Sequence, residues 1–254
     1  MGKEIFVVAQ REYYLLRATP RSMFESVFYP ILYMLIFAPA IGSQVGPIDV
    51  GMTEVPYMLF ALPGILIFNG FSASQYGGIS LYIHKLLGDF EMVLSFPLRR
   101  SSIVWGKIIP IVIKSMIQTL VFIFLCVLFF GWNAFSLTTL LILLFTSTLF
   151  TLLGAMIFLS ISASIERQDT FNIMVNMITL PIMFTSNALY SLEKAPYILQ
   201  IISKINPLTY FISAMRETMF LQHYESIFIL WILGLVLLFP LIKVTGHRLQ
   251  KAIR

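Results

Sequence analysis

Charge is scarce along this chain, and it is missing altogether between Ser115 and Ile165. That stretch holds no Asp, Glu, Lys, Arg or His, and its apolar run is interrupted at Gly131-Trp132-Asn133. A helix rises about 1.5 Å per residue and the hydrocarbon core of a bilayer is about 30 Å thick, so the stretch is too long for one crossing. It is predicted to form two membrane spans joined by a tight turn.

Charged residues make up only 11% of the 254 residues, whereas hydrophobic residues make up 58%. Soluble domains carry about 25% charged residues, so this composition predicts an integral membrane protein. Cysteine is almost absent too. The single Cys126 excludes a disulfide within these residues and any cysteine metal cluster.

Motifs for intramembrane chemistry are also missing. The chain has no His-Glu-x-x-His sequence and no pair of carboxylates within an apolar run, so metal-dependent and aspartyl hydrolysis lack their groups. Gly70-Phe71-Ser72 resembles the nucleophile turn of a membrane serine protease, but the nearest histidine, His84, lies beyond the end of that apolar run. Gly106-Lys107 is followed by Ile108 and lacks the preceding glycine that a phosphate-binding loop has at a fixed distance. The sequence predicts no catalytic residues, no metal site and no cofactor in this chain.

Runs without charge predict an all-α membrane protein with six transmembrane helices, at residues 26–43, 55–76, 108–130, 137–160, 171–190 and 226–242. Lys and Arg gather before the first span, between the second and third, and after the sixth. Because basic residues favour the cytoplasmic side, both termini are predicted to lie inside a multi-pass protein of the cell membrane. Lys194, Lys204 and Arg216 are exceptions, since the segment before the last span is then external.

Residues 1–22 are predicted to form a helix along the inner membrane surface rather than across the membrane. At helical spacing, one face carries Ile5, Phe6, Ala9, Tyr13 and Leu16. Val7 and Tyr14 depart from that pattern. An anchor and a part of a gating device are both open interpretations of this helix.

Uncharged polar residues form a stripe on the fifth predicted span, and the second span adds a shorter set at similar spacing. The residues are Asn172, Asn176, Thr179, Met183 and Asn187 on the fifth span, and Asn69, Ser72 and Tyr76 on the second. On an ideal helix the fifth-span set falls within an arc of roughly 80°. Each residue alone is typical of a hydrogen bond between helices. As a continuous stripe, with Pro181 able to bend the helix, the set also predicts the lining of a transport pathway.

The segment between the second and third spans, residues 80–107, combines both signs of charge with bulky apolar side chains. Phe90, Met92, Leu94 and Phe96 are not expected in a solvated loop. The mixture is typical of a short helix that lies against a protein partner. An interfacial helix that rests on lipid is the alternative.

This segment resembles the corresponding part of the type-2 permease family of ATP-binding-cassette exporters, which runs Gly-x-x-Glu, then Pro, then Arg, then Gly-Lys. Standing in that order are Gly88, Glu91, Pro97, Arg99 or Arg100, and Gly106-Lys107. Pro63-Gly64 in the second span matches as well, as does the run 206–210 followed by Arg216. Over residues 1–254 the chain is similar to a single type-2 transmembrane domain, and residues 185–190 and 206–210 are most similar to the daunorubicin-type, drug-resistance branch.

The resemblance implies that the chain pairs with a second permease copy, identical or paralogous, and binds separate cytoplasmic ATPase subunits that hold ATP and Mg. Coupling to these subunits would run through Lys85, Gly88, Asp89, Glu91, Pro97, Arg99 and Arg100. Residues 188–224 would fold as re-entrant helices on the outer side, where Asn206 and Thr209 could cap helices beside Pro207 and Tyr210.

Three functions remain open at this point. The first hypothesis is export of a hydrophobic or amphipathic, drug-like substrate. Polysaccharide and lipid-linked glycan exporters share much of the implied architecture and are the alternative within transport. A membrane scaffold or sensor component that transports nothing is the alternative of another class. Lipid and protein are the expected contacts, and nucleic acid is not.

Overall fold

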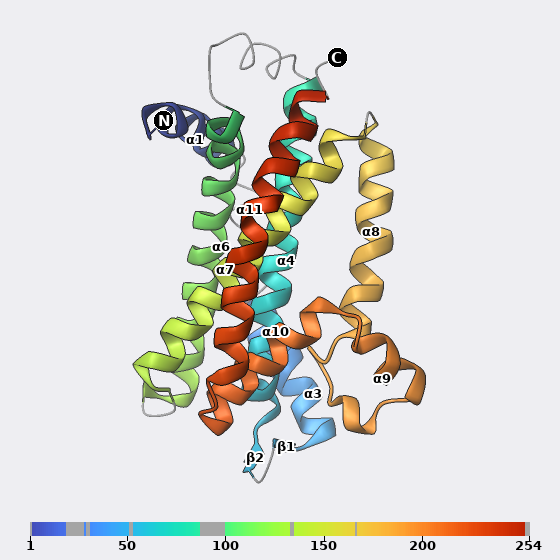
Figure 1. Cartoon of the computed structure of the whole chain (residues 1–254). Helices are drawn as coiled ribbons and strands as arrows, with labels where there is room; N and C mark the ends of the chain where they lie inside the picture. The colour runs from blue at the N-terminus through green and yellow to red at the C-terminus, as the bar shows by residue number, and fades with distance from the viewer. Residues whose placement is uncertain are drawn as a thin grey trace.

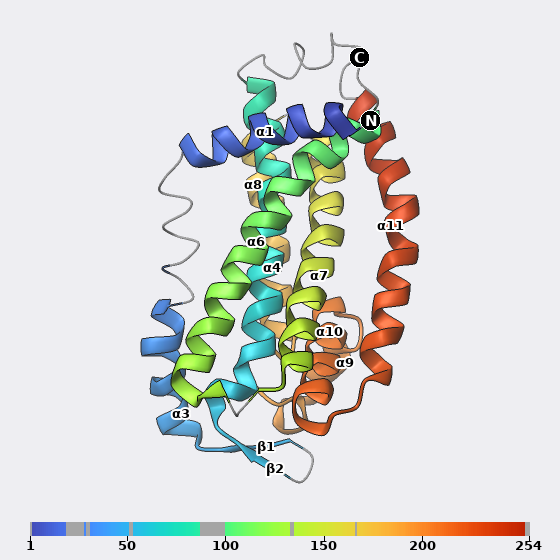
Figure 2. The same ribbon diagram turned by 90° about the vertical axis from the view of Figure 1, so that its left-hand side faces the viewer.

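The computed structural model describes residues 2–18, 28, 31–50, 53–86, 100–132, 135–165 and 167–251. Long helices lie side by side along one axis, and α1 (Gly2–Ala18) runs across them at one end (Figures 1 and 2). The elements that follow α1 are a π-helical turn (Tyr33–Phe37), α3 (Ala38–Val45), β1 (Ile48–Val50), β2 (Thr53–Val55), α4 (Tyr57–Leu86), α6 (Arg100–Phe130), α7 (Leu137–Ala163), α8 (Gln168–Thr185), a 3-10 turn (Leu192–Lys194), α9 (Tyr197–Ser203), α10 (Pro207–Arg216), a second π-helical turn (Glu217–Leu221) and α11 (Glu225–Lys251).

Small residues let α4 and α7 pack closely at the centre of the bundle. A Cβ atom added at Gly154 would lie 2.6 Å from the Ser74 hydroxyl oxygen, and one added at Gly70 would lie 2.7 Å from the Thr151 hydroxyl oxygen. Near one end of this interface, Ser162 donates a hydrogen bond to the Gly78 carbonyl oxygen at 2.6 Å. Close approach at small residues is the usual way in which membrane helices associate, because lipid supplies no hydrophobic driving force between them.

Four helices of the described residues are long and apolar enough to cross a membrane: Tyr57–Tyr82, Ser101–Phe130, Leu137–Ala163 and Glu225–Leu249. They correspond to the second, third, fourth and sixth predicted spans, which confirms an all-α membrane protein. The first predicted span overlaps the shorter apolar helix Tyr33–Val45, and most of its beginning lies outside the described residues. The fifth corresponds to α8, which has 18 residues and is not among the four. The count of six remains a prediction.

Helix boundaries differ from the predicted ones where helices leave the apolar layer. The α4 helix continues to Leu86, past the predicted end at residue 76, and α6 begins at Arg100 rather than at residue 108. Both ends of the 80–107 segment are therefore helical. A run of apolar residues shows where a helix is surrounded by lipid. It does not show how far the helix continues into the polar interface.

The connection between α6 and α7, at the end of the bundle opposite α1, is short. Between α6 and α7, Gly131 adopts a φ of +80°, and the Ser136 hydroxyl caps α7 by accepting from the Thr138 backbone nitrogen at 3.3 Å. These features agree with the predicted tight turn. An antiparallel hairpin of β1 and β2, in which Asp49 lies opposite Glu54, was not predicted.

Candidate functional site

One end of the bundle brings together α1, the end of α4, the start of α6 and the end of α11 (Figures 1 and 2). Among the predicted coupling residues, Lys85 lies in the last turn of α4 and Arg100 begins α6. The two helix ends that flank residues 87–99 therefore lie at this end of the bundle. We call it the inner end, because the distribution of basic residues predicts that it faces the cytoplasm. Gly88, Asp89, Glu91, Pro97 and Arg99 lie outside the described residues.

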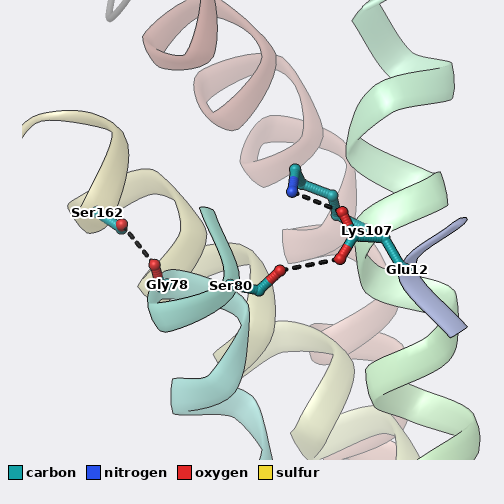
Figure 3. A network of polar contacts seen from close by, with 5 residues as sticks. All are labelled: Glu12, Gly78, Ser80, Lys107 and Ser162. Atoms are coloured by element: carbon teal, nitrogen blue, oxygen red, sulfur yellow. Dashed lines mark hydrogen bonds and ion pairs between the residues drawn. The ribbon is translucent and has the colours of Figure 1, made fainter. Parts of the chain in front are cut away.

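A buried ion pair fixes α1 to the bundle at the inner end. Lys107 of α6 is 4% exposed and Glu12 of α1 is 7% exposed. The Lys107 ammonium donates to one Glu12 carboxylate oxygen at 2.7 Å, and the Ser80 hydroxyl of α4 donates to the other oxygen at 2.9 Å (Figure 3). One carboxylate thus bridges α4 and α6. We call Glu12, Ser80 and Lys107 the inner junction.

Two further contacts follow from the same face of α1. The Ser102 hydroxyl of α6 donates to the Glu4 carboxylate at 2.8 Å. A Cβ atom added at Gly106 would lie 2.5 Å from the Val8 Cβ atom, so α1 crosses α6 directly over this glycine. Glu4, Val8 and Glu12 are four residues apart and share one helix face. The Gly106-Lys107 pair therefore forms part of a docking surface for α1.

The burial of α1 differs from the predicted face. Val8 and Glu12 are buried, whereas Phe6, Val7, Tyr13 and Tyr14 are exposed. The last four are spaced by one and seven residues, so they share the face opposite the bundle. Val7 and Tyr14, which departed from the predicted apolar face, belong to the exposed one. An aromatic face of this kind suits the interface between water and lipid.

The predicted polar stripe on the fifth span divides in the structure. The α8 helix ends at Thr185, so Asn187 lies beyond it, is buried, and donates to the Ser213 hydroxyl of α10 at 2.8 Å. Thr179 accepts from the Gln75 side chain of α4 at 2.8 Å. Asn176 is exposed, while Asn172 and Met183 are half-buried. An unbroken stripe from Asn172 to Asn187 on one helix was therefore a wrong prediction, because the chain turns before it reaches Asn187.

The second-span residues also have different surroundings. Asn69 is half-buried, and its side-chain nitrogen has no hydrogen-bond partner among the described residues. Ser72 is exposed. Tyr76 is half-buried, and the Lys114 ammonium lies 4.9 Å from the centre of its ring. The structure brings Thr179 to α4 through Gln75, which the sequence analysis did not single out.

The segment before the last span forms short helices at the other end of the bundle, called the outer end below (Figure 1). Asn206 caps α10, as expected, by accepting from the Leu208 backbone nitrogen at 3.0 Å, and Pro207 follows in the first helical position. Tyr210 donates to the Lys204 carbonyl oxygen at 2.5 Å. The Thr209 hydroxyl is buried without a partner among the described residues, so its expected capping role was wrong.

Arg216 fixes this segment to α4. It is 6% exposed, and its Nε and Nη2 atoms donate to the carbonyl oxygens of Phe60 and Ala188 at 3.0 and 3.1 Å. Its guanidinium lies 3.6 Å from the centre of the Phe60 ring. A Cβ atom added at Gly64 would lie 2.4 Å from the Ala188 carbonyl oxygen, so this backbone rests directly on α4. We call Arg216, Phe60, Gly64 and Ala188 the outer junction.

A pocket of about 480 Å³ opens beside the outer junction. Apolar side chains form most of its wall, and Asp49 and Glu193 supply carboxylates. On one side, the Tyr57 hydroxyl donates to the Leu189 carbonyl oxygen at 3.1 Å. Within the described residues, no group of three or more His, Cys, Asp or Glu side chains could hold a metal ion.

Glu12, Ser80 and Arg216 carry contacts that the sequence analysis did not assign. Glu12 and Lys107 are far apart in sequence, and no local pattern joins them. A signal did exist, because Lys107 stands at the edge of an apolar run and a buried ammonium needs a counter-charge. Arg216 was noted only as an exception to the charge rule, although the cost of burying a cation could have marked it as structural.

These features define a multi-pass helical membrane protein. A model of the ABC-2 type transporter family matches residues 3–220, and the chain belongs to that family. It is 30% identical to the transport permease ycf38 of Cyanophora paradoxa, over 84% of this chain and 73% of that protein. It is 24% identical to the inner membrane transport permease YadH of Escherichia coli (strain K12), over 79% and 76%. It is 26% identical to the daunorubicin resistance ABC transporter permease protein DrrB1 of Streptomyces coeruleorubidus, over 86% and 74%.

Proposed function

We propose that this chain is the membrane-spanning subunit of an ATP-binding-cassette exporter, which moves a hydrophobic or amphipathic substrate out of the cell with ATP hydrolysed by a separate subunit. Family membership over residues 3–220 carries the proposal. Similarity to a daunorubicin resistance permease favours a drug-like substrate. The partner subunit would hold ATP and Mg, so the assembled complex rather than this chain would be the ATPase.

Force from the partner would enter at residues 87–99. The helices on either side, α4 and α6, are continuous through the bundle, so a displacement at their inner ends reaches the outer end without a break. Such a displacement would tip the bundle between inward-open and outward-open states. A second permease copy would complete the pathway, with Asn69, Ser72, Tyr76, Asn172 and Asn176 as candidates for its lining.

The decisive experiment replaces Glu91 in the coupling segment. Glu91→Lys should leave insertion and yield unchanged but abolish co-purification of the ATPase subunit and ATP-dependent accumulation of daunorubicin in inside-out vesicles. Glu54→Lys, at an exposed position in β2, is the matched control and should behave as the unmodified protein. Normal export by Glu91→Lys would refute the assigned coupling route.

Orientation can be tested in whole cells with an impermeant thiol reagent. Asp49 lies in β1 at the outer end and Asp169 in the first turn of α8 at the inner end, and both are exposed. With Cys126→Ser as background, Asp49→Cys should react and Asp169→Cys should not. The reverse result would place the termini outside and overturn the proposed direction of transport.

Two other functions would give different results. A glycan exporter would fail to accumulate daunorubicin but would restore export in a strain that lacks its own glycan permease. A scaffold would bind the ATPase without any ATP-dependent transport. The family's transport relatives favour transport over a scaffold.

A further inference from the structure

The inner junction holds two charges where a free charge would be costly. Lys107 lies within the helix stretch Ser101–Phe130, which is apolar enough to cross a membrane. It is 4% exposed, and Glu12 meets it at 2.7 Å. An ammonium removed from water needs both a counter-charge and good geometry. Glu12 supplies the charge from a different segment of the chain, so α1 cannot leave α6 without exposing Lys107 unpaired.

Glu12 does more than neutralise Lys107, because each of its oxygens binds a different helix. One oxygen accepts from Lys107 of α6 and the other from Ser80 of α4 (Figure 3). These are the two helices whose inner ends flank residues 87–99. Two residues before Ser80, the Gly78 carbonyl accepts from Ser162, which extends the polar contacts to α7. The carboxylate therefore ties both sides of the coupling segment together through a third element.

The fit of α1 onto α6 is as specific as the charge pairing. Val8 is 6% exposed and lies against Gly106, where a Cβ atom would come within 2.5 Å of the Val8 Cβ atom. Glu4 accepts from Ser102 one helix turn away. A surface anchor would need only an apolar face toward lipid. Here acidic side chains face the protein and aromatic ones face outward, which is an arrangement for binding protein and lipid at once.

We propose that Glu12 is a positioning residue that straps the inner ends of α4 and α6 together, so that α1, α4 and α6 move as one body when the coupling segment is displaced. The Gly106-Lys107 pair of α6 is the surface on which Val8 and Glu12 of α1 dock. The proposal rests on the proposed function for its consequence in transport, while the docking of α1 can be measured without any ATPase subunit.

Docking is tested first, with Cys126→Ser as background. Val8 and Val7 are neighbours, but Val8 is 6% exposed and Val7 63%. A thiol reagent should label Val7→Cys rapidly and Val8→Cys slowly in purified protein. Adding Glu12→Met should raise labelling of Val8→Cys by about tenfold, the size expected of coupling between residues in direct contact, and leave Val7→Cys unchanged. Unchanged labelling of Val8→Cys would show that Glu12 does not hold α1.

The strap is tested next by comparing stability with transport per ATP hydrolysed. Glu12→Met leaves Lys107 unpaired, whereas Glu12→Met with Lys107→Met removes both charges and should recover thermal stability. If Glu12 acts as a strap, the double variant should still transport about tenfold less per ATP, because no group joins α1 to Ser80. If the double variant recovers both thermal stability and transport per ATP, Glu12 and Lys107 only stabilise the fold, and the proposed positioning role is wrong. Gln10→Ala, on the exposed face of α1, is the matched control and should change neither.

A covalent link provides the opposite test. Glu4→Cys with Ser102→Cys, joined by a short bifunctional thiol reagent, would fix α1 to α6 at a contact that already exists. If the two move as one body, the linked protein should retain full transport. Loss of transport on linking, reversed when a cleavable reagent is cut, would show that α1 must slide on α6 and would overturn the proposal. If the proposed function is wrong, the unmodified protein will show no ATP-dependent transport, while the labelling results at Val8→Cys will be unchanged.

Discussion

The inner and outer junctions bury charge in two different ways. At the inner junction, the Lys107 ammonium meets the Glu12 carboxylate, so two opposite charges share one site. At the outer junction, the Arg216 guanidinium is held by two backbone carbonyls and the Phe60 ring, and no carboxylate pairs with it among the described residues. Each arrangement fastens a short peripheral segment to α4. At the inner junction, the loss of one charge can be offset by a second substitution that removes the opposite charge, and at the outer junction it cannot.

The difference lies in what each junction requires of its partners. A pair of side-chain charges requires charge balance, which several combinations of residues can meet. A guanidinium that donates to carbonyls in two directions requires the planar fork of arginine at a fixed place, because the carbonyls belong to backbone that cannot be substituted. The outer junction therefore depends on shape, and the inner junction depends on charge.

The largest effect is expected where the outer junction meets backbone. Gly64→Ala would drive its methyl group into the Ala188 carbonyl oxygen, which lies 2.4 Å from the Cβ position. Neither helix nor carbonyl can move aside, so we expect almost no correctly folded protein in gel filtration. Gly246→Ala in α11 is the control and should fold, because a Cβ atom at this buried glycine would meet no other packed atom within 4 Å among the described residues. At the inner junction, Gly106→Ala places its Cβ atom 2.5 Å from the Val8 side chain and 3.4 Å from the Ala9 backbone nitrogen. Both belong to a peripheral helix that can shift outward, so the damage should be milder than at Gly64. Equal damage from both variants would erase this contrast.

Breaking the inner pair on one side should produce the next largest effect. Glu12→Gln leaves Lys107 buried without its counter-charge, which should lower the free energy of unfolding by about 3–5 kcal/mol. Adding Lys107→Met should return most of that loss. The measurement is thermal unfolding in detergent, analysed as a double-mutant cycle. Additive losses would mean that the two charges do not interact.

Arg216→Lys should lower stability by a smaller amount, and no second substitution that removes a charge should restore it. Lysine keeps the positive charge, yet its three donors share one nitrogen, which cannot occupy the separate positions from which Nε and Nη2 reach the Phe60 and Ala188 carbonyls. An unmade hydrogen bond to a buried carbonyl costs about 1–3 kcal/mol, which sets the expected loss in the same unfolding assay. If Arg216→Lys is as stable as the unmodified protein, charge rather than shape holds the outer junction.

Sequence reasoning predicted the parts of this protein that lipid dictates. The charge-free run from residue 115 to 165 predicted α6, α7 and the turn between them, because hydrocarbon demands apolar residues in continuous runs. The cap at Asn206 was likewise predictable from its position before Pro207. Both inferences use neighbours in the chain.

Contacts between distant segments could not be predicted in the same way. Glu12 and Lys107 meet only because α1 crosses α6 at Gly106, and nothing near Glu12 in the sequence specifies that crossing. The stripe on α8 was misjudged for a related reason. Helical spacing assumes that the helix continues, whereas α8 ends at Thr185 and the next residues turn toward α10.

The smallest effect on stability is expected on α8, which contributes no residue to either junction. Asn176 is exposed, so Asn176→Leu should change the free energy of unfolding by less than about 0.5 kcal/mol. The neighbouring Thr179 bonds to Gln75 at 2.8 Å, so Thr179→Val is the matched variant and should lose about 0.6 kcal/mol, the average for a hydrogen bond between membrane helices. If α8 lines the pathway, Asn176→Leu should alter the range of transported substrates while Thr179→Val leaves it unchanged, since only the first residue is open to a passing molecule. Vesicle transport of several amphipathic dyes would measure this range. If Thr179→Val alters the range and Asn176→Leu does not, the pathway lies on the face of α8 that packs on α4.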